Sequence, residues 1–487
     1  MEERNYLPHS SHFSVPYFSV KLLDFMEDLR YAHLVGIGGA GMTALADVLL
    51  GMGWSLSGSD LAAQDVGRWE SLGVRCHAGH SARHVPPRTD QVVFSSAIDP
   101  ENPELCRARE LNIPTLSYAQ TLGRLMADRH GVAVAGTHGK STTTAMAAQI
   151  LVDAGMDPTV VLGATPLGAS SGGRAGGGKA MLVEACEYRR NFLHLRPRQA
   201  VILGIEPDHF DCYDSPAALE SAFTDFAALV PAEGRLLVRH DCPVSRRAAA
   251  AAACPTETFG LAPDADWSAD ELHAVRGRYR FSLIGHGRRL GEVTLRTPGR
   301  HNVLNALAAA ATAISLGATA ERAIRGLGRF RGLHRRVERL GTWGGVLLVD
   351  DYAHHPTEVT ASLATVRAMA PGRRLWCVFQ PHQASRTEHL LDELADSLQN
   401  ADRVLLADIF RARERPALPG DVTSADLARA VRQRGRDVPD FHGMEQIEQF
   451  LTTQLTPGDV LVTMGAGDIG RIGYGIMERF RKDRAAG

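Results

Sequence analysis

The sequence predicts an α/β protein of three domains, each built on a mainly parallel sheet. A chain of 487 residues has room for about three domains of ordinary size. Short apolar runs alternate with helical stretches along most of it, which is the order of strands joined by helical crossovers. Glycine-rich turns follow two of these runs, and polar residues follow most of the others. We expect an extension at 1–28 and domains at 29–127, 128–336 and 337–487.

The composition is that of an ordinary globular protein. Hydrophobic residues make up 44% of the chain, charged residues 22%, and the formal net charge is −2, so no nucleic-acid partner is expected. No apolar run is long enough to span a bilayer, and 1–28 lacks the pattern of a signal peptide. The seven cysteines form no Cys-x-x-Cys pair, which indicates reduced thiols. We therefore expect a cytoplasmic protein without a membrane partner, as a monomer or a homodimer.

The first glycine-rich turn follows a predicted strand at 31–37. Its spacing matches the dinucleotide fingerprint, in which small residues let a pyrophosphate approach a helix N-terminus. The three glycines are Gly36, Gly38 and Gly41. An acid, Asp60, follows about 20 residues later, where this kind of fold has one. NAD(P) and a nucleoside diphosphate such as a UDP-sugar both fit this pattern, and so does close packing without a ligand.

Two further features belong to this first domain. A strand at 92–97 contains Ser95 and Ser96 near its end, and their hydroxyls would face the usual ligand edge of the sheet. His77 and His80 have a spacing that metal ligands can have. A histidine pair in an exposed loop is more often solvated surface, so we expect no metal there.

The second glycine-rich turn is the strongest signal in the chain. An apolar run at 132–135 is followed by the turn at 136–139 and by a helix. The turn is shorter than a full P-loop, because Val134 stands where that motif has its first glycine. Free backbone N–H groups and the helix dipole would hold phosphate there. Lys140 would reach the outer phosphates, and the Ser141 hydroxyl would ligate Mg²⁺.

Lysine usage supports this interpretation. The chain has only four lysines among its 53 lysines and arginines, and one of them directly follows Gly139. A compact ammonium fits between phosphate oxygens where a planar guanidinium does not fit easily. We therefore interpret the segment as a nucleotide-binding turn rather than an ordinary surface turn.

Acidic and basic groups follow the next strands of the second domain. A strand at 181–183 ends in Glu184, and a strand at 200–205 is followed by Asp208 and His209. Groups at strand ends beside a phosphate-binding turn lie where open α/β sheets hold ligands. Glu184 and His209 are therefore candidate ligands of a Mg²⁺-nucleotide. The alternatives are a structural histidine and an aspartate that caps a helix.

The rest of the second domain contains three unusual stretches. Residues 163–178 are rich in glycine and serine, and we expect a mobile loop. Residues 262–297 alternate weakly and predict a β-rich insertion. Asn302 and Asn305 are three apart near a helix start, and so lie on one helix face. Because asparagine is a poor choice for a helix interior, we expect their amides to read a base edge; N-capping would explain only one of them.

The third domain repeats the strand-and-helix pattern. Four strands are expected, each followed by polar residues at its carboxyl end. They lie at 346–349, 374–379, 403–407 and 459–463. The first is followed by acids and histidines that could form a zinc site. These are Asp350, Asp351, His354 and His355. Without a cysteine or a further spaced acid, a cluster that faces substrate or phosphate is the better interpretation.

The ordered set of motifs resembles one known family, the Mur ligases. No single motif is decisive, but together they run through almost the whole chain in the order of the family. The stretches are GIGGAGM (36–42), SGSD (57–60), GTHGKSTTTAM (136–146), VEACEYRRNFLHLRP (183–197), DHFDCY (208–213), PGRHNVLNA (298–306), LHRR (333–336), DDYAHHPTE (350–358), FQPH (379–382) and TMGAGD (463–468). Within the family the resemblance is to the branch that adds L-alanine.

The resemblance implies a Rossmann-like domain for the UDP substrate, a central P-loop ATPase domain, and a Rossmann-like C-terminal domain for the amino acid. It implies that ATP phosphorylates the carboxylate of UDP-N-acetylmuramate. The amine of L-alanine then displaces phosphate, in the synthesis of peptidoglycan precursors. Such chemistry needs a phosphate cradle, a divalent metal and positive charge near the developing oxyanion.

The resemblance also implies a role for individual residues. The ATP site would consist of Gly136, Thr137, His138, Gly139, Lys140, Ser141, Thr142, Asn302, Asn305, Arg335, Asp350 and His354. The UDP-sugar would contact Gly38, Gly39, Ala40, Gly41, Met42, Asp60 and Ser96. Mg²⁺ would be held by Ser141, Glu184 and His209, and the amino-acid carboxylate by His382 and Arg386. The catalytic groups would be Lys140, His209, Arg335 and Asp351.

Two departures from the family pattern bear on function. The family often has an arginine where Gln383 stands, ahead of the retained Arg386. This leaves open a recycling ligase that adds a preformed peptide to the same sugar nucleotide. No lysine stands between Lys179 and Lys482 to be carbamylated, and in this the chain is similar to the alanine-adding branch. An NAD(P)-linked oxidoreductase is the alternative of another class, but it would leave Lys140 without a role.

Overall fold

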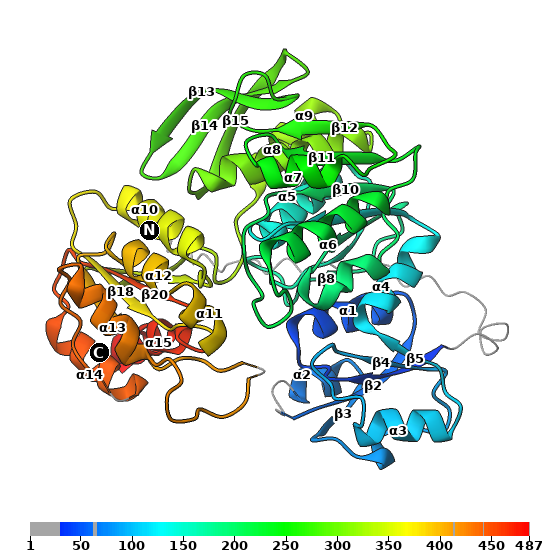
Figure 1. Cartoon of the computed structure of the whole chain (residues 1–487), viewed down its shortest axis with the longest axis horizontal. Helices are drawn as coiled ribbons and strands as arrows, with labels where there is room; N and C mark the ends of the chain where they lie inside the picture. Colours follow the sequence, from blue (N-terminus) through cyan, green and yellow to red (C-terminus); the bar gives the residue numbers. More distant parts are fainter. Residues whose placement is uncertain (1–29, 62–65, 413, 442, 487) are drawn as a thin grey trace, which may run out of the picture.

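The computed structural model describes residues 30–61, 66–412, 414–441 and 443–486. The extension expected at 1–28 lies outside them. The described chain forms three sheets, whose strands come from 31–117, 130–298 and 338–464. In Figure 1 the first body, in blue and cyan, lies below the second, in green, and the third, in yellow to red, lies to their left. The α/β architecture with three domains that the sequence predicts is confirmed.

The first domain is a five-stranded, fully parallel sheet in the order β3-β2-β1-β4-β5. Its strands are β1 (Tyr31–Val35), β2 (Ser55–Asp60), β3 (Arg75–Ala78), β4 (Gln91–Phe94) and β5 (Thr115–Ser117). Its helices are α1 (Ala40–Gly51), α2 (Val66–Ser71), the 3₁₀ helix η1 (Ala82–His84), α3 (Pro103–Glu110) and α4 (Tyr118–Ala127). β1 is buried at every position, as expected of a central strand covered on both faces. The first glycine turn therefore lies at the carboxyl edge in the middle of the sheet, where α/β sheets bind ligands.

A buried polar network holds this sheet to the elements that cover it. The Glu104 carboxylate in α3 is fully buried. It accepts hydrogen bonds from the Ser59 hydroxyl (2.5 Å) and the Ser81 amide (3.1 Å), and contacts His84 Nδ1 at 2.8 Å and His33 Nε2 at 3.4 Å. Burial acts to raise the pKa of Glu104, but the bonds from His33 and Ser59 lower it to about 2. Glu104 is thus an ionised, fully partnered carboxylate.

The expectation that His77 and His80 are solvated surface is wrong for His80. Its side chain is 11% exposed, and its Nδ1 lies 3.0 Å from the Ser59 hydroxyl and 3.6 Å from Glu104. His77 stacks on His84, with ring centroids 4.2 Å apart. The acid that gathers these histidines comes from a helix later in the chain, so their local spacing did not reveal it.

The second domain is built on a ten-stranded sheet in the order β15-β14-β13-β12-β11-β10-β6-β9-β7-β8. Its parallel part contains β6 (His130–Ala135), β7 (Thr159–Val161), β9 (Ala180–Glu184), β10 (Gln199–Ile202), β11 (Arg235–Arg239) and β12 (Thr256–Phe259). The antiparallel strands β13 (Trp267–Val275), β14 (Arg278–Gly285) and β15 (Arg288–Pro298) form the insertion predicted at 262–297. The helices are α5 (Lys140–Asp153), the 3₁₀ element η2 (Tyr188–His194), α6 (Pro216–Ala228), α7 (Pro243–Ala249), α8 (His301–Ser315) and α9 (Ala320–Arg329). Since β6 lies between β10 and β9, the second glycine turn is also central.

The glycine-rich stretch at 163–178 packs closely, and the loop predicted there is wrong in part. It contains β8 (Gly173–Arg174), which pairs antiparallel with β7. A Cβ added to Gly173 would lie only 2.1 Å from the carbonyl oxygen of Ala44 in α1. One added to Gly178 would lie 2.0 Å from the carbonyl oxygen of Met156. Gly173 therefore lets the backbone of the second domain approach α1 of the first, and Gly178 lets it approach the segment after α5.

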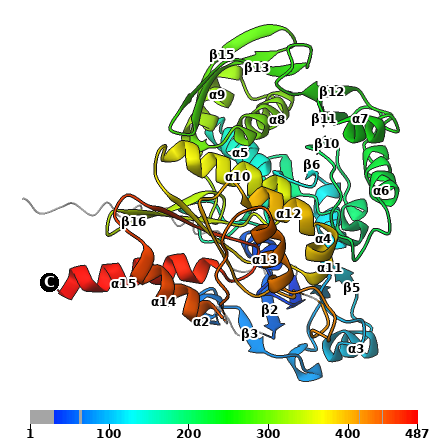
Figure 2. The same ribbon diagram turned by 60° about the vertical axis from the view of Figure 1, so that its left-hand side comes forward.

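The third domain has a five-stranded sheet in the order β16-β17-β20-β18-β19. Its strands are β16 (Glu338–Trp343), β17 (Val346–Asp351), β18 (Leu375–Phe379), β19 (Arg403–Leu406) and β20 (Val460–Met464). The four predicted strands are parallel, and β16 adds an antiparallel edge. The helices are α10 (Pro356–Met369), α11 (Ala384–His389), α12 (Leu391–Leu398), α13 (Ser424–Gln433), α14 (Met444–Gln454) and α15 (Gly470–Ala486). In Figure 2, α10 lies next to the insertion of the second domain, and a Cβ on Gly277 would lie 3.2 Å from Met369 Cγ.

The connection between the second and third domains has an unusual backbone. The φ angles of Arg335 and Val337 are +57° and +48°, in the left-handed region that is costly for a β-branched residue. The Val337 amide donates to Asp351 Oδ2 (3.0 Å), and the Tyr352 amide donates to the Arg335 carbonyl (2.7 Å). The end of β17 thus holds the linker in this conformation.

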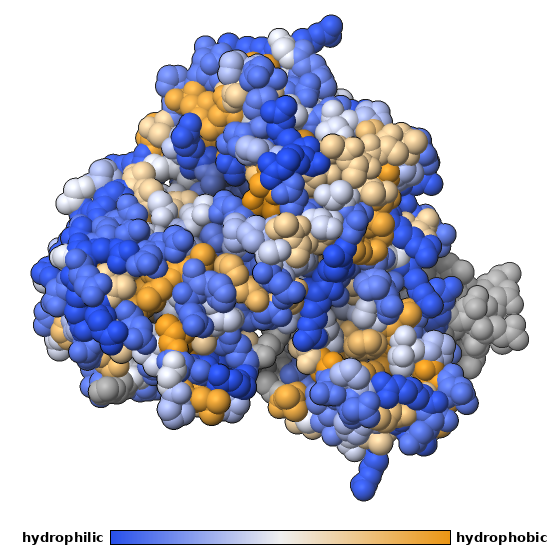
Figure 3. Space-filling model, in the orientation of Figure 1, coloured by the Kyte–Doolittle hydropathy of each residue, from blue (hydrophilic) through white to orange (hydrophobic). Residues whose placement is uncertain are grey.

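The surface shows no sign of a membrane-spanning helix. On the face drawn in Figure 3, hydrophobic residues form small patches among hydrophilic ones. Among the helices that the structure describes, none is long and apolar enough to cross a bilayer.

The Glu104 network predicts that a substitution at Glu104, in the first domain, lowers stability. The variant Glu104→Gln turns an acceptor oxygen into a donor inside a buried network, and should lower the free energy of unfolding by about 1–3 kcal/mol at pH 7. The folded-state pKa of Glu104 is lowered from 4.5 to about 2, so its stabilisation is present above pH 4.5 and is lost as the pH falls towards 2. In urea unfolding, the difference between wild type and variant should therefore shrink below pH 4.5.

The control is Glu110→Gln, which changes an exposed acid at the end of the same helix. It should change the free energy of unfolding by less than about 0.5 kcal/mol. Equal losses from the two variants would contradict the structural role of Glu104.

Candidate active site

The phosphate turn, residues 136–139, joins β6 to α5. The φ angles of Gly136 and Gly139 are +134° and +81°. A Cβ on Gly139 would lie 2.5 Å from Asn305 Oδ1, and one on Gly136 would lie 3.0 Å from Leu203 Cβ. Glycine is therefore needed at both positions, for backbone angle and for space. Since α5 begins at Lys140, its unpaired N-terminal N–H groups lie at the turn and favour an anion.

Lys140 lies directly against this turn. Its Nζ donates to the carbonyl oxygens of Gly136 (2.6 Å) and Thr137 (3.2 Å), and lies 2.9 Å from Glu187 Oε1. Burial acts to lower the pKa of Lys140, but Glu187 raises it above its ordinary value, so the group is an ammonium. Glu187 was missed from the sequence as a site residue, although it stands in the motif at 183–197.

Ser141 and Glu184 lie together, as a shared Mg²⁺ site requires. The Ser141 hydroxyl donates to Glu184 Oε2 at 2.9 Å, and the Gly163 amide donates to the same oxygen at 2.9 Å. Mg²⁺ binds oxygen at about 2.1 Å in an octahedron, so neighbouring ligand atoms are about 3 Å apart. The two oxygens therefore fit adjacent positions on one ion, and the other positions would go to water or phosphate.

His209, the third predicted metal ligand, lies next to a different acid. Its Nε2 is 3.6 Å from Glu187 Oε1 and 4.0 Å from Asp208 Oδ2, and its ring packs edge-on against Tyr188. His209 thus shares the Glu187 carboxylate with Lys140. Metal binding and catalysis by His209 stay predictions.

A cavity of about 150 Å³ lies between the phosphate turn and the third domain. It brings together predicted residues from two domains. These are His138, Gly139, Thr142, Asn302, Asn305 and Asp351. Sequence analysis missed other residues in its lining, among them His301, whose pKa burial lowers to about 4. A neutral ring and two amides at one wall suit a flat heteroaromatic ligand.

Asn302 and Asn305 bond to each other and not to the end of the helix. Asn305 Nδ2 donates to Asn302 Oδ1 (3.0 Å), and Asn302 Nδ2 donates to the Pro298 carbonyl (2.6 Å). The N-cap of α8 is Arg300, without a side-chain cap, so N-capping by an asparagine is wrong. Adenine binding by the two amides stays a prediction.

A second cavity, of about 480 Å³, lies between the first and second domains. The first glycine turn and the end of β4 line one side of it, with the predicted residues Gly39, Ala40, Gly41, Met42 and Ser96. Glu184 and Cys186 line the other side. Glu184 thus belongs both to this cavity and to the pair with Ser141, which connects the cavity to the start of α5.

Asp60 and Gly38 bond to each other at the edge of this site. The Gly38 amide donates to Asp60 Oδ2 at 2.9 Å, and a Cβ on Gly38 would lie 3.0 Å from that oxygen. The acid at the end of β2 therefore fixes the first glycine turn. Contact of either residue with a UDP-sugar stays a prediction.

Asp351 is a buried acid that serves the linker. Its carboxylate accepts hydrogen bonds from the Val337 amide (3.0 Å), the Ala353 amide (2.8 Å) and the Ser362 hydroxyl (2.9 Å). Burial raises its pKa to about 6. Because Asp351 also lines the first cavity, it couples the linker to that site; a catalytic role stays a prediction.

Arg335 and Asp350 form a pair at the edge of the third sheet. Arg335 Nε lies 3.3 Å from Asp350 Oδ2, and its Nη2 donates to the Gly465 carbonyl (2.6 Å). Asp350 is fully buried, which raises its pKa, and it accepts a hydrogen bond from Thr463 (2.7 Å). The Arg335 guanidinium lies 5.0 Å from the centre of the Tyr352 ring. Nucleotide binding by either member of the pair stays a prediction.

The predicted amino-acid clamp is engaged in an ion pair between two domains. Arg386 Nε donates to Asp208 Oδ1 at 2.8 Å, and its Nη1 lies 2.9 Å from His382 Nδ1. Although burial acts to raise it, Arg386 holds the pKa of Asp208 well below its ordinary value. The His354 ring lies 5.5 Å from His382, and burial lowers the pKa of His354 to about 4. Carboxylate binding by Arg386 would require its bond to Asp208 to open, and it stays a prediction.

The first two side chains of the phosphate turn contact acids that sequence analysis missed. The Thr137 hydroxyl donates to the Glu206 carbonyl (3.1 Å) and accepts from its amide (2.9 Å). His138 Nδ1 lies 3.1 Å from Glu358 Oε1. Glu358 is the last residue of the motif at 350–358, so that motif was a usable signal. Glu206 lies outside the motifs, two positions before the one at 208–213.

Three domain descriptions match the chain. They are "Mur ligase family, catalytic domain" at 31–130, "Mur ligase middle domain" at 134–313, and "Mur ligase, glutamate ligase domain" at 335–467.

Relatives match over almost their whole length. The chain is 40% identical over 451 residues to UDP-N-acetylmuramate–L-alanine ligase of Desulfitobacterium hafniense, covering 92% of this chain and 99% of the relative. It is 42% identical over 443 residues to the enzyme of the same name from Oleidesulfovibrio alaskensis, covering 91% and 97%. The solved structure of UDP-N-acetylmuramate–alanine ligase MurC from Thermotoga maritima matches with a TM-score of 0.78 at 26% identity, covering 93% and 99%. A murein peptide ligase from Psychrobacter arcticus matches with a TM-score of 0.69 at 26% identity, covering 93% and 98%. The ordered motifs, the three sheets and these matches agree, and the chain belongs to the Mur ligase family.

Proposed function

We propose that this protein is an ATP-dependent ligase that joins L-alanine to the carboxylate of UDP-N-acetylmuramate, in cytoplasmic synthesis of peptidoglycan precursors. The relatives at 40% and 42% identity carry this activity in their names. In this proposal residues 29–127 bind the UDP-sugar, 128–336 bind ATP, and 337–487 bind the amino acid. A chain of this kind would work as a monomer or a homodimer.

One observation carries the proposal: the phosphate turn lies between the two cavities. Gly139 lines the cavity shared with the third domain, and Glu184, bonded to Ser141, lines the cavity shared with the first. A nucleotide in one cavity and a sugar nucleotide in the other would therefore meet at Lys140. Such an arrangement converts a bimolecular encounter into a positioned reaction.

The first step would be phosphoryl transfer at this meeting point. A carboxylate oxygen of UDP-N-acetylmuramate forms a bond to the γ-phosphorus, while the bond from that phosphorus to the bridging oxygen of ADP breaks. Lys140 and the N–H groups at the start of α5 stabilise the charge on the transferred group. Ser141 and Glu184 would hold Mg²⁺, which would supply further positive charge.

The second step would form the amide. The amine of L-alanine attacks the acyl carbon of the acyl phosphate, a C–N bond forms, the C–O bond to phosphate breaks, and the nitrogen loses a proton. Arg335 supplies positive charge for the tetrahedral intermediate. Arg386 and His382 orient the amino-acid carboxylate once the bond to Asp208 has opened, so movement of the third domain relative to the second is part of the cycle.

A recycling ligase that adds a preformed peptide is the second candidate. Gln383 favours it, because the family often has an arginine there. This side chain is buried, with φ of +67° at the N-terminus of α11. The murein peptide ligase structure also shares the fold, but the relatives at 40% and 42% identity are alanine ligases by name. The oxidoreductase alternative is set aside by the family assignment.

The choice between the two ligases predicts which acceptor releases phosphate. With ATP, Mg²⁺ and UDP-N-acetylmuramate, L-alanine should give a kcat/KM for phosphate release at least about 100-fold higher than a tripeptide that begins with L-alanine. A site with little room beyond one amino acid rejects the longer substrate through steric cost in the transition state. Release with the tripeptide alone would contradict L-alanine as the substrate.

The role of Lys140 predicts a loss of turnover in a folded protein. Lys140→Met should lower kcat/KM by about 100- to 1,000-fold, because a positioned charge on the transferred phosphoryl group is lost. Lys179→Met, at an exposed lysine, should stay within about twofold. The double variant Lys140→Met/Glu187→Gln removes the unpaired buried carboxylate that the single variant leaves. Circular dichroism should show all three variants folded, and undiminished turnover of a folded Lys140→Met protein would contradict the mechanism.

A further inference from the structure

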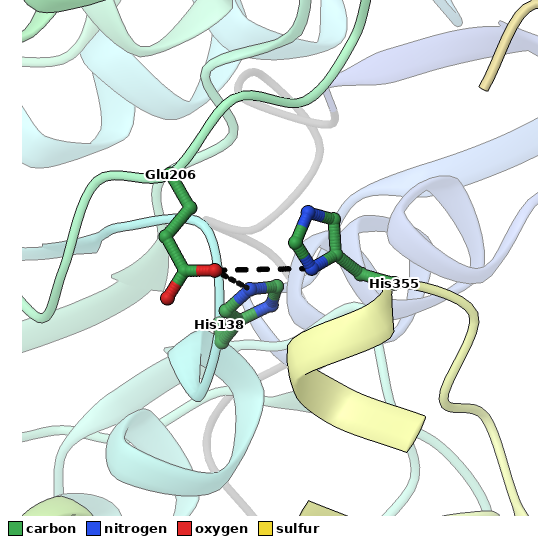
Figure 4. Close-up of side chains that lie close together, drawn as sticks. All are labelled: His138, Glu206 and His355. Carbon is green, nitrogen blue, oxygen red and sulfur yellow. Dashed lines mark ion pairs between the residues drawn. The ribbon is translucent and has the colours of Figure 1, made fainter. Parts of the chain in front are cut away.

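Three ligand-type side chains from two domains meet beside the phosphate turn. His138 belongs to that turn, Glu206 lies in the loop after β10, and His355 is the N-cap of α10. One ligand atom from each lies within 4.8 Å of the others. Figure 4 shows the two rings approaching the Glu206 carboxylate from the second and the third domain. The Mg²⁺ pair uses none of the three side chains, and no step of the proposed reaction is assigned to them, although His138 is also a predicted ATP contact.

The separations of Glu206 from the two rings are close to those around a tetrahedral metal ion. Glu206 Oε2 lies 3.5 Å from His138 Nε2 and 3.8 Å from His355 Nδ1. Zinc binds nitrogen and oxygen ligands at about 2.0–2.1 Å, so two ligands of a tetrahedral ion are about 3.3–3.4 Å apart. The two separations from Glu206 thus exceed the tetrahedral value by only about 0.1–0.5 Å, and the two ring nitrogens lie within 4.8 Å of each other.

On each ring, the nitrogen that faces away from Glu206 (the outer nitrogen) has the kind of partner that metal-binding histidines have. His138 Nδ1 lies 3.1 Å from Glu358 Oε1, and His355 Nε2 lies 3.2 Å from the Pro207 carbonyl. A proton on each outer nitrogen bonds to these oxygens and leaves a lone pair on the inner nitrogen. Carboxylate and carbonyl acceptors in this position orient metal-bound imidazoles and raise their basicity.

The three ligand atoms that face one another have few hydrogen-bond partners. His138 Nε2 is buried and has no hydrogen-bond partner among the residues that the structure describes. His355 Nδ1 accepts one long bond, from the Thr357 amide at 3.3 Å. The Thr357 hydroxyl donates to Glu206 Oε2 at 2.6 Å. A carboxylate oxygen has a second lone pair, so the same oxygen can still face a metal. The donor set is thus two imidazoles and one carboxylate, with a fourth position open to water.

We propose that His138, Glu206 and His355 form a site for a borderline-soft divalent transition ion, of which Zn²⁺ fits best. Two imidazoles distinguish this set from the all-oxygen pair of Ser141 and Glu184, which suits Mg²⁺. Because the ligands come from both domains, the bound ion links α10 to the phosphate turn. It would hold the third domain closed without nucleotide and so inhibit turnover.

A proton is the competing occupant of this position. Burial acts to lower the pKa of His138, but Glu358 and Glu206 raise it to about 9. An imidazolium between two carboxylates would join the same domains without metal. The two occupants can be distinguished directly. Only the metal ion predicts stoichiometric metal binding that depends on His355.

The test is calorimetric titration of the full chain with Zn²⁺, after EDTA treatment and removal of nucleotide. One Zn²⁺ per chain should bind at this site. His355→Asn should weaken its binding at least about tenfold while keeping a good N-cap for α10. Glu206→Gln keeps the shape of the acid and should weaken binding similarly. The matched control is His286→Asn, at an exposed histidine beside Glu257, which should bind as the wild type does.

Cobalt distinguishes this site from the seven cysteines. Co²⁺ in the wild type should give the visible bands of a four-coordinate nitrogen and oxygen site, and these bands should be lost in His355→Asn. Equal Zn²⁺ affinity in the wild type and both ligand variants would overturn the proposal. So would the absence of stoichiometric binding, or a strong sulfur-to-cobalt charge-transfer band that is unchanged in His355→Asn.

Discussion

The ammonium of Lys140, whose side chain is 13% exposed, is the charge around which the site is arranged. It contacts two carbonyl oxygens of its own turn and the Glu187 carboxylate. Glu187 in turn lies next to His209. Removing an unpaired ammonium from water would cost several kcal/mol. The Glu187 carboxylate offsets this cost by pairing with Lys140. A triphosphate brings negative charge of the same kind and would replace or reinforce that partner.

Contacts between domains assemble much of the rest of the site. Glu184 lines the cavity against the first domain, and Asp351 lines the cavity against the third. The Arg386–Asp208 pair and the His138–Glu358 contact both join the second domain to the third. The left-handed backbone at Val337 lies in the linker between the same two domains. In the described arrangement these contacts occupy groups that the reaction would need.

The sequence predicted what is local and missed what is brought together by folding. The strand, the glycine turn and the helix start at 132–141 were predictable, because backbone angles and apolar runs are encoded within a few residues. The same holds for the shared helix face of Asn302 and Asn305. Glu187 escaped because nothing in its own neighbourhood marks an acid as the partner of Lys140.

The errors have the same origin. The glycines at 163–178 predicted a loop, since a short sequence cannot show that a helix backbone lies 2.1 Å from where a Cβ would stand. His80 was taken for a surface residue because the acid that it meets lies in α3. The cluster of His138, Glu206 and His355 was not visible either, because its members come from three separate segments.

The most direct test of this account is a crystal structure of the protein with UDP-N-acetylmuramate and a non-hydrolysable ATP analogue. The account predicts the γ-phosphate within about 2.7–3.2 Å of Lys140 Nζ, the adenine beside Asn302 and Asn305, and the muramate carboxylate at the γ-phosphorus. A triphosphate bound elsewhere, with the turn at 136–139 empty, would contradict it.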